Sequence, residues 1–373
     1  MRLRGETWGA WIRLEHAPLL LAVDHAGLAS LAITPPPPRP GPSAPLEVHV
    51  AVTSQCSAGC TGCYLDATPG GHSPEKGEIV RRLEGLADAG VFTVAFGGGE
   101  PLVRDDLPDL ARAARGLGLL PVMTTSGLGL TARRATELRD FAQINVSYDG
   151  VGADYAEVRG IDAARHAERA IEALVAAGVR TGANVVLTRA TMPRAADTLE
   201  RAKALGCVDA QLLRYKPRGR AASLEYLSRR LSADQVRRFP ALLRAWSARA
   251  RPMSLRVDCS MIPWFSTDPS LADAARLTRL GIFGCEAGGH LAALSVDGAT
   301  APCSFLPPGD GDLHRAHARA PREPCASCPI FAVCKGGCRA VSAFSGDPWA
   351  PDPECPKVVA WRGAAAHGRP EPA

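Results

Sequence analysis

The sequence lacks any run of the roughly 18 apolar residues that a membrane-spanning helix needs. Arg2 and Arg4 lie near the N-terminus, but the apolar run that follows, Pro18–Val23, is short. Asp24 and His25 end this run, and no convincing cleavage site follows, so the pattern is not that of a secretory signal peptide. We therefore expect no membrane contact and a cytoplasmic location.

The sequence also lacks a strong excess of charge of one sign. It has 43 Lys and Arg residues against 38 Asp and Glu residues, and the net charge of +5 is spread along the chain. A bias this mild gives no reason to expect a nucleic acid partner. Apolar residues make up 46% of the chain, which argues against wholesale disorder, and a length of 373 residues is typical of two domains.

Cysteine is plentiful, and its distribution is uneven. Three of the 12 cysteines form one group, Cys56, Cys60 and Cys63. Seven form a second group: Cys285, Cys303, Cys325, Cys328, Cys334, Cys338 and Cys355. Cys207 and Cys259 stand alone, and we interpret Cys207 as a buried core residue. In a reducing compartment, clustered cysteines are more often metal ligands or catalytic groups than disulfides.

Residues 1–45 predict a small β element followed by a linker. Short apolar stretches predict strands at Trp11–Leu14, Pro18–Val23 and Ala29–Ile33, separated by turn residues. The proline-rich segment Pro35–Pro45 predicts a stiff linker. A substrate peptide could add to an exposed edge of these strands, and simple packing against the rest of the molecule is the alternative.

Between residues 46 and 250, apolar runs alternate with amphipathic stretches. The predicted strands are Glu47–Thr53, Val91–Phe96, Leu120–Thr125, Gln143–Ser147, Thr181–Leu187 and Val208–Arg214. The predicted helices are Glu75–Ala89, Leu107–Gly116, Ala132–Asp140, Ala163–Ala177 and Arg194–Leu205. We expect Ser73 to cap the first helix and Gly90 to end it. Such alternation implies parallel strands and an α/β fold, a partial (β/α)6 TIM-like barrel with its chemistry at the carboxyl ends of the strands.

The regular pattern ends soon after residue 250. Ser232–Arg249 predicts a further helix capped by Ser232, and Met253–Cys259 predicts a strand. Residues 285–373 are rich in Cys, Gly and Pro and show little periodicity. A segment this irregular needs metal cross-links in addition to a core. We therefore expect a small irregular C-terminal domain at residues 251–373.

The first cysteine group has the spacing C-x3-C-x2-C and follows the first predicted barrel strand, where this fold places its site. Three thiolates can bind three irons of a four-iron cubane and leave the fourth iron open. A zinc site is the alternative, but zinc usually takes four ligands and the nearest imidazole is that of His72.

The order of these elements resembles the radical S-adenosylmethionine (SAM) superfamily: a strand, the cysteine triplet, a helix, and a strand ending in Gly97–Pro101. The resemblance implies that the three cysteines hold a 4Fe–4S cluster whose open iron binds SAM, which is cleaved to a 5′-deoxyadenosyl radical. It also implies a segment that binds the SAM amino group, made of Gly98, Gly99, Glu100 and Pro101. Glycine suits this role because the backbone must approach the ligand closely.

Further motifs extend the resemblance to the rest of the SAM site. Thr124–Gly127 resembles the family's Thr-Asn-Gly, with Ser126 in place of asparagine, and Ser147–Gly150 resembles Ser-x-Asp-Gly near the SAM ribose. Arg159 resembles an arginine that reaches the SAM carboxylate, and a surface salt bridge is the alternative. The family's aromatic residue before the third cysteine is replaced by Gly62. The implied cofactor contacts outside the glycine segment are Tyr64, Ser126, Ser147, Asp149 and Arg159.

The second cysteine group resembles the seven-cysteine SPASM domain of radical SAM maturases in its spacing. The resemblance implies two auxiliary 4Fe–4S clusters. The nearer cluster would be held by Cys285, Cys303 and Cys338, and the farther one by Cys325, Cys328, Cys334 and Cys355. The nearer cluster is one ligand short, so either Cys259 supplies the fourth thiolate or one iron is open. A zinc-binding interaction module is the alternative for the whole group.

The resemblance implies oxidative modification of a peptide or protein, by thioether formation, carbon–carbon crosslinking or dehydrogenation, as in the maturation of ribosomally made natural products. A flavodoxin or ferredoxin would supply electrons. One alternative is a radical SAM oxidoreductase acting on a small molecule such as a sugar alcohol or a tetrapyrrole. A noncatalytic metal-dependent binding module is another.

Some polar residues are candidates for contact with the substrate. Asp258 is a candidate general base near the nearer auxiliary cluster. Four residues after the sixth strand are candidate substrate contacts, namely Arg214, Tyr215, Arg218 and Arg220. A solvated basic loop is the alternative for these four.

Overall fold

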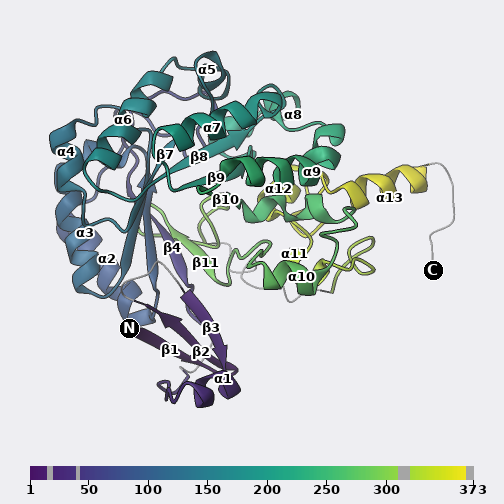
Figure 1. Ribbon diagram of the computed structural model, residues 1–373, viewed down its shortest axis with the longest axis horizontal. Helices are drawn as coiled ribbons and strands as arrows, with labels where there is room; N and C mark the ends of the chain where they lie inside the picture. Colours follow the sequence, from purple (N-terminus) through teal and green to yellow (C-terminus); the bar gives the residue numbers. More distant parts are fainter. Residues whose placement is uncertain (15–19, 39–42, 310–319, 367–373) are drawn as a thin grey trace.

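The computed structural model describes residues 1–14, 20–38, 43–309 and 320–366. Its described strands form two sheets (Figure 1), one of three strands in the order β1-β2-β3 and one of nine in the order β10-β9-β8-β7-β6-β5-β4-β11-β12. The nine-stranded sheet runs from one edge strand to another and does not close into a barrel within the described chain.

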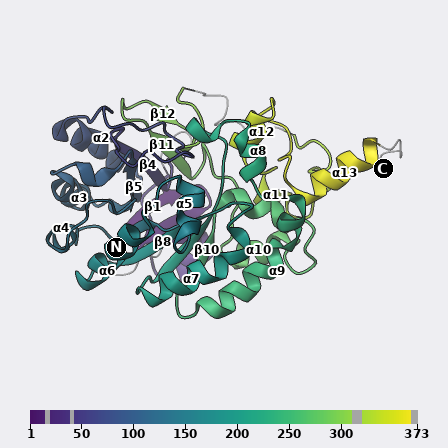
Figure 2. The ribbon, with the colours of Figure 1, turned by 90° about the horizontal axis from the view of Figure 1, so that it is seen from above.

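Six strands of the large sheet are parallel and follow one another in chain order. They are β4 (Glu47–Thr53), β5 (Thr93–Gly98), β6 (Leu120–Thr125), β7 (Gln143–Ser147), β8 (Thr181–Leu187) and β9 (Asp209–Arg214). Between them run α2 (Lys76–Ala89), α3 (Leu107–Gly116), α4 (Ala132–Glu137), α5 (Ala153–Arg159), α6 (Ala164–Ala176) and α7 (Ala195–Ala204). The predicted α/β fold with the strand order of a partial barrel is thus confirmed, and Figure 2 shows the helices along the outside of the sheet.

The two faces of the large sheet differ in chemistry. Side chains such as Val48, Val50 and Val52 are buried in the core between the sheet and the helices, together with Leu83 and Leu110. The residues between them point to the other face, here called the inner face, because successive side chains of a strand point to opposite faces of the sheet. It carries mostly polar side chains: Glu47, His49, Thr124, Gln143, Asn145, Ser147, Asn184, Asp209, Gln211 and Arg256.

A chain of hydrogen bonds crosses the inner face. Gln143 Nε2 donates to Asn145 Oδ1 at 2.7 Å, and Asn145 Nδ2 donates to Asn184 Oδ1 at 2.9 Å. Asn184 Nδ2 donates in turn to Thr124 Oγ1 at 3.3 Å. On β4, His49 Nε2 lies 3.0 Å from Glu47 Oε1, and both side chains are more than a third exposed, at 38% and 42%. This face is therefore not packed as an apolar core.

The chain beyond residue 250 contributes strands to both edges of the large sheet. β10 (Ser254–Val257) pairs in parallel with β9 at one edge. β11 (Leu291–Leu294) pairs in parallel with β4, and β12 (Thr300–Ala301) pairs antiparallel with β11 at the other edge. The predicted strand Met253–Cys259 corresponds to β10, whereas the sequence predicted neither β11 nor β12. The proposed domain boundary at residue 250 thus separates segments that share a sheet.

The C-terminal region is built from short helices and loops. After α8 (Glu225–Arg229), α9 (Ala233–Ala250) begins at Ser232, which forms the expected cap as part of a capping box with Gln235. The remaining helices are α10 (Ala274–Arg279), α11 (Phe331–Cys334), α12 (Arg339–Phe344) and α13 (Pro356–Ala366). Short 3-10 segments are η1 (Pro101–Val103), η2 (Met192–Arg194), η3 (Gly219–Ala221) and η4 (Cys259–Phe265). None of the helices in the described chain is both long and apolar enough to cross a bilayer.

The N-terminal element corrects one predicted strand. β1 (Arg2–Glu6), β2 (Gly9–Arg13) and β3 (Leu20–Asp24) form an antiparallel sheet. The predicted strand Ala29–Ile33 is wrong, because α1 (His25–Ser30) occupies its start and Asp24 caps this helix by accepting from the Gly27 backbone N–H at 2.7 Å. Parts of the predicted strand at 18–23 and of the linker at 35–45 lie outside the described residues.

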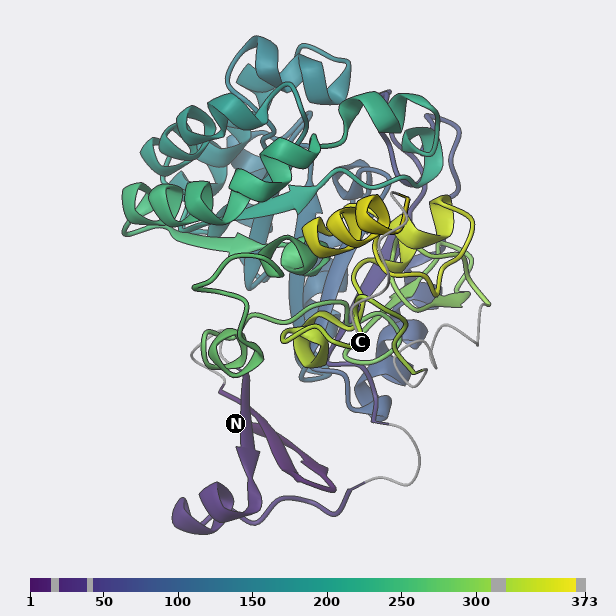
Figure 3. The same ribbon diagram turned by 90° about the vertical axis from the view of Figure 1, so that its right-hand side faces the viewer.

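The N-terminal element packs against the amino ends of the barrel strands. Arg2 donates to the carbonyls of Ala87 and Gly118, each at 3.0 Å, and Arg4 donates to Gly90 O at 3.0 Å. Gly90 and Gly118 lie in the turns that lead into β5 and β6, so this contact is at the edge opposite the cysteine loop, as Figure 3 shows. Packing against the barrel is therefore observed, and strand addition by a peptide stays a prediction.

For α2, the predicted N-cap residue is wrong and the predicted C-terminal glycine is correct. Glu75, not Ser73, is the N-cap residue, because the Ser73 hydroxyl is 2.6 Å from the Thr53 hydroxyl and is not available to the helix. Gly90 ends the helix with a φ of 92°, a left-handed conformation that favours glycine.

Candidate active site

The first three cysteines lie on the loop that follows β4, at the carboxyl edge of the sheet. Backbone hydrogen bonds fix this loop at both ends: Cys56 N donates to Thr68 O at 2.8 Å, and Thr61 N donates to Arg159 O at 3.1 Å. Cys56, Cys60 and Cys63 are free thiols of intermediate exposure. Burial is the main cause that raises the pKa of Cys56, and the neighbouring Cys60 and Cys63 contribute in the same direction. The three thiols are thus gathered in one partly open place.

Residues after β9 hold the cysteine loop from the other side. The Arg220 backbone N–H donates to Cys63 O at 2.9 Å, and its guanidinium donates to Cys60 O at 3.0 Å and Ala67 O at 3.2 Å. Arg220, a candidate substrate contact in the sequence, therefore binds the backbone of the loop. The role of Arg218 as a substrate contact stays a prediction.

Tyr215 fills the space beside Gly62. A Cβ atom added at Gly62 would lie 3.0 Å from two atoms of the Tyr215 ring, and Tyr215 is itself buried and stacked on Tyr226. An aromatic ring thus lies next to the position before the third cysteine, although it comes from the residue that follows β9 instead of from the loop. This packing explains why the position is glycine, and it places Tyr215 against the loop instead of in solvent.

The glycine segment at the end of β5 lies against the start of the cysteine loop. Gly98 has a φ of 112°, and a Cβ added there would lie 2.2 Å from Thr53 O. A Cβ at Gly99 would lie 2.2 Å from Gln55 O. The backbone N–H groups of Gly99 and Glu100 donate to Thr53 O and Gln55 O at 2.7 and 2.9 Å. Glycine is needed here because two backbone segments are in contact.

The Glu100 carboxylate connects the ends of β5 and β6. Its Oε1 accepts from Thr125 Oγ1 at 2.6 Å and from Leu102 N at 3.1 Å. Its Oε2 accepts from Ser126 N at 2.7 Å and from Ser126 Oγ at 2.6 Å. These four donors match the roughly four acceptor positions of a carboxylate. A SAM amino group at Glu100 would therefore share the carboxylate with them, and Pro101 begins the 3-10 segment η1 that follows.

Arg159, at the end of α5, pairs with a buried carboxylate. Its Nε donates to Asp149 Oδ2 at 2.5 Å, and its Nη1 is 3.9 Å from Cys60 Sγ. Asp149 is 1% exposed and also accepts from the Val186 backbone N–H at 2.6 Å. Burial lowers the pKa of Arg159, but Asp149, Tyr155 and Cys60 raise it above its usual value. The pair is thus not a surface salt bridge, and it places a cation beside the first cysteine group. Ser147, on β7 two residues before Asp149, is also buried.

Four cysteines from the C-terminal region form a group near the barrel: Cys259, Cys285, Cys303 and Cys338. Burial is the main cause that raises the pKa of Cys259, and Asp258, Cys285 and Cys338 contribute. Burial, Cys285 and Cys338 raise the pKa of Cys303 to about 12. Cys259, at the start of η4, thus lies with the three cysteines that the SPASM resemblance assigned to the nearer cluster.

The other four cysteines line one cavity, and they are Cys325, Cys328, Cys334 and Cys355. Burial raises the pKa of Cys325 to about 12, with contributions from Cys355 and Cys328. Cys355 Sγ is 3.2 Å from Ser266 Oγ, at the end of η4. The grouping is the one that the resemblance implied, and the ligand roles stay a proposal. Within the described chain, no three His, Cys, Asp or Glu side chains form a group that could hold a single metal ion.

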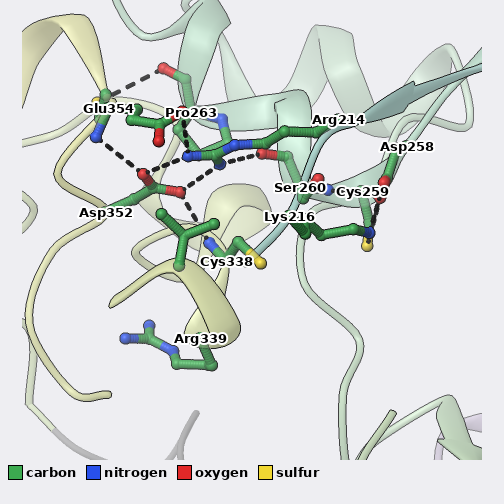
Figure 4. Close-up of polar contacts among 12 residues, drawn as sticks. Arg214, Lys216, Asp258, Cys259, Ser260, Pro263, Cys338, Arg339, Asp352 and Glu354 are labelled. Atoms are coloured by element: carbon green, nitrogen blue, oxygen red, sulfur yellow. Dashed lines mark hydrogen bonds and ion pairs between the residues drawn. The ribbon is translucent and has the colours of Figure 1, made fainter. Parts of the chain in front are cut away.

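A buried ion pair connects the barrel with the second cysteine region (Figure 4). Arg214, at the end of β9, donates to Asp352 Oδ2 and Oδ1 at 2.7 and 3.0 Å and lies 2.8 Å from Glu354 Oε2. Asp352 Oδ2 also accepts from the Cys338 backbone N–H at 3.0 Å. Arg214 is 3% exposed, so it is neither a solvated loop residue nor free to bind substrate.

A second buried ion pair lies beside Cys259. Lys216 Nζ is 2.6 Å from Asp258 Oδ2 and 3.9 Å from the centre of the Phe305 ring, on which Tyr64 stacks at 4.8 Å. Burial raises the pKa of Asp258, but the Lys216 charge and hydrogen bond hold it below its usual range. Asp258 is thus an ion-paired carboxylate, and its role as general base stays a prediction. Cys207, by contrast, is in the main apolar core, as expected.

The fold and the site define an α/β protein with an open parallel sheet and a three-cysteine loop at the carboxyl end of its first barrel strand. Residues 50–202 match the radical SAM superfamily. The chain therefore contains a radical SAM domain.

Relatives of known activity extend along most of the chain. It is 26% identical over 342 residues to the AdoMet-dependent heme synthase of Oleidesulfovibrio alaskensis, which covers 82% of this chain and 85% of that protein. It is 28% identical over 344 residues to the PqqA peptide cyclase of Streptomyces rochei, covering 85% and 90%. In fold it is similar to Streptococcus suis SuiB bound to its precursor peptide SuiA, with a TM-score of 0.68, 18% identity and coverage of 88% and 78%.

Proposed function

We propose that this chain is a radical SAM enzyme with two auxiliary 4Fe–4S clusters that oxidatively modifies a peptide or protein. The observation that carries the proposal is the division of 11 cysteines into three groups: a partly exposed group of three at the carboxyl edge of the sheet and two groups of four, in each of which two cysteines are buried. Three thiolates suit a cluster with an open iron, and four suit a closed one. Cys259 completes the nearer auxiliary group, which favours four thiolate ligands over an open iron.

The residues around the first cysteine group suit the binding of SAM beside a cluster. Bound there, the cluster and SAM would supply a 5′-deoxyadenosyl radical able to remove a hydrogen atom from the substrate. The chain itself binds and orients: Arg159 offers a guanidinium to the carboxylate of SAM, and Asp149 holds that guanidinium in place. Glu100 fixes the ends of β5 and β6 together, so that backbone groups of Gly98, Gly99 and Ser126 keep their positions. Tyr64 and Ser147 remain proposed contacts of the cofactor.

The inner face of the sheet favours a peptide over a tetrapyrrole as substrate. A peptide presents N–H and C=O groups along its length, and the inner face carries amide and hydroxyl side chains that would exchange their hydrogen bonds with one another for bonds to such groups. A tetrapyrrole is a broad apolar ring system with carboxylates, which calls for apolar walls and available cations. On the inner face as defined above, Arg256 lies 3.2 Å from Asp209 and is thus paired. The relationship to the PqqA peptide cyclase supports the same substrate class.

A second candidate is a radical SAM oxidoreductase that acts on a small molecule, and the similarity to a heme synthase favours it. Incubating the reduced holoenzyme with SAM and either a short Cys- or Gly-rich peptide encoded beside its gene or a tetrapyrrole would separate the two. Deoxyadenosine release that rises with the peptide and a mass change in the peptide support the first candidate. The same changes with the tetrapyrrole support the second.

Metal content and SAM cleavage test the class of enzyme. We expect the anaerobically reconstituted chain to contain about twelve irons, in three four-iron clusters, and to release deoxyadenosine from SAM under reduction by flavodoxin or ferredoxin. Replacing Cys56, Cys60 and Cys63 by alanine should leave about eight irons and abolish deoxyadenosine release. Zinc in place of iron, with no SAM cleavage, would contradict the proposal and favour a metal-dependent binding module.

A further inference from the structure

One buried tyrosine next to the first cysteine group has a polar atom without a partner. Tyr155 lies on α5 and is 0% exposed, and its hydroxyl has no hydrogen-bond partner among the described residues. Buried polar groups are almost always hydrogen-bonded, because leaving one unpaired costs free energy of folding. An unpaired hydroxyl at this place therefore calls for an explanation, and a ligand that supplies an acceptor is one.

The surroundings of this hydroxyl are those of the proposed SAM site. Arg159 lies four residues further along α5, so the two side chains are on the same side of the helix. The charges of Arg159, Asp149, Cys60 and Glu100 all act on Tyr155. Burial is the main cause that raises the pKa of Tyr155 to about 12, so the hydroxyl carries its proton at neutral pH and can donate it to a hydrogen bond.

The neighbouring acceptors are already in use. Glu100 accepts four hydrogen bonds from Thr125, Ser126 and Leu102. Asp149 accepts from Arg159 and from the Val186 backbone. A further anionic oxygen, brought by a ligand, would serve both a neutral donor and the Arg159 guanidinium.

We propose that Tyr155 is a further cofactor-binding residue, whose hydroxyl donates a hydrogen bond to the carboxylate of SAM beside the guanidinium of Arg159. The inference rests on the proposed function, because it requires that SAM binds at the first cysteine group. It adds a neutral donor to the charged one and explains an unpaired buried atom that the cysteine motif does not involve.

A second buried tyrosine provides a matched control. Tyr148 lies at the end of β7 and is also 0% exposed, but its hydroxyl donates to Glu168 Oε1 at 2.7 Å, away from the cysteine loop. Phenylalanine at either position removes one oxygen atom and leaves the ring. The two substitutions should therefore have opposite effects on stability and on SAM affinity.

The experiment measures SAM affinity by equilibrium dialysis and thermal unfolding of the reconstituted holoenzyme without SAM. We expect Tyr155→Phe to weaken SAM binding about tenfold and to leave the unfolding temperature unchanged or raised. Tyr148→Phe should lower the unfolding temperature and leave SAM affinity unchanged. Decarboxylated SAM, which lacks the proposed acceptor, should bind Tyr155→Phe as well as it binds the wild type.

Two results would overturn the inference alone: unchanged SAM affinity in Tyr155→Phe, or an equal loss of affinity for SAM and for decarboxylated SAM, which would show a merely structural role. A wild-type holoenzyme that fails to bind SAM would overturn the proposed function, and the inference with it. The wild-type measurement thus separates the two failures.

Discussion

The two cysteine regions of this chain differ in how the protein holds them. Cys56, Cys60 and Cys63 are partly exposed on a loop that backbone hydrogen bonds attach to the barrel. In the second region, four of the seven cysteines are buried among short helices and loops, namely Cys285, Cys334, Cys338 and Cys355, and the other three are partly exposed. A site that binds a new SAM molecule in each turnover needs an opening, whereas a cluster that stays in place does not.

This difference indicates which of the two cysteine regions depends on metal for its structure. The cysteine loop is fixed by Arg220, by the Gly99–Glu100 backbone and by Thr61, so its position follows from protein contacts. The second region has few long elements, and its cysteines come from segments that are distant in sequence. Metal bonds there would close long loops and stabilise the region through the unfolded state.

Removal of iron should produce the largest difference between the two cysteine regions. We expect chelation of all clusters to raise amide hydrogen exchange in the described part of residues 285–366 by at least about tenfold, since a region held by metal opens without it. Strands β4 to β9 should stay protected, because their hydrogen bonds belong to the parallel sheet. Mass spectrometry of exchange before and after chelation measures both. Equal loss of protection in both regions would contradict the distinction.

Replacing Arg214 should have the next largest effect, because it joins the two regions. Arg214→Leu leaves Asp352 buried without its cation, whereas Glu354 keeps Arg230 at 3.2 Å, and breaking such a buried pair costs about 3–5 kcal/mol in the free energy of unfolding. Arg244→Leu is a suitable control, since Arg244 is 51% exposed and pairs with Asp268. We expect that control to lose less than about 1 kcal/mol in denaturant unfolding. Similar losses in both variants would show that the pair does not join the regions.

Replacing Cys259 should have the smallest effect on stability, and a defined effect on metal content. Cys259→Ser removes the fourth thiolate of the nearer auxiliary group, so we expect iron to fall from about twelve toward about eight per chain. Cys207→Ser, in the apolar core, should keep about twelve irons. Iron analysis and the electron paramagnetic resonance spectrum of the reduced protein measure the change. An unchanged spectrum in Cys259→Ser would favour an open iron in that cluster.

Much of the barrel could be predicted because its local signals agree with its packing. The predicted strands Glu47–Thr53 and Gln143–Ser147 have the observed bounds, since apolar runs there end at turn residues. The same holds for Leu120–Thr125 and Thr181–Leu187. Local signals failed where two of them competed, as at Asp24, whose side chain begins a helix in place of a third strand ending at Ile33.

The remaining features depend on partners that are distant in sequence. β11 is a short run of Leu and Ala whose pairing with β4 no local pattern shows. Arg214 was predicted as a substrate contact because its partner Asp352 lies far along the chain. Tyr155 was missed because its sequence neighbours, apart from Arg159, carry no motif. Its only signal is an unpaired hydroxyl, which requires side-chain positions.

The pairing of β4 with β11 has a consequence for folding during synthesis. β4 ends at residue 53, but its outer neighbour begins at residue 291 and therefore leaves the ribosome much later. At roughly 5–20 residues per second, β4 waits on the order of 10–40 s with one edge unpaired after β5 has paired with the other. An unpaired strand edge attracts other extended chains. The nascent chain thus has a period in which chaperone binding to this edge would be most useful. This period ends only when β11, at the start of the second cysteine region, is made.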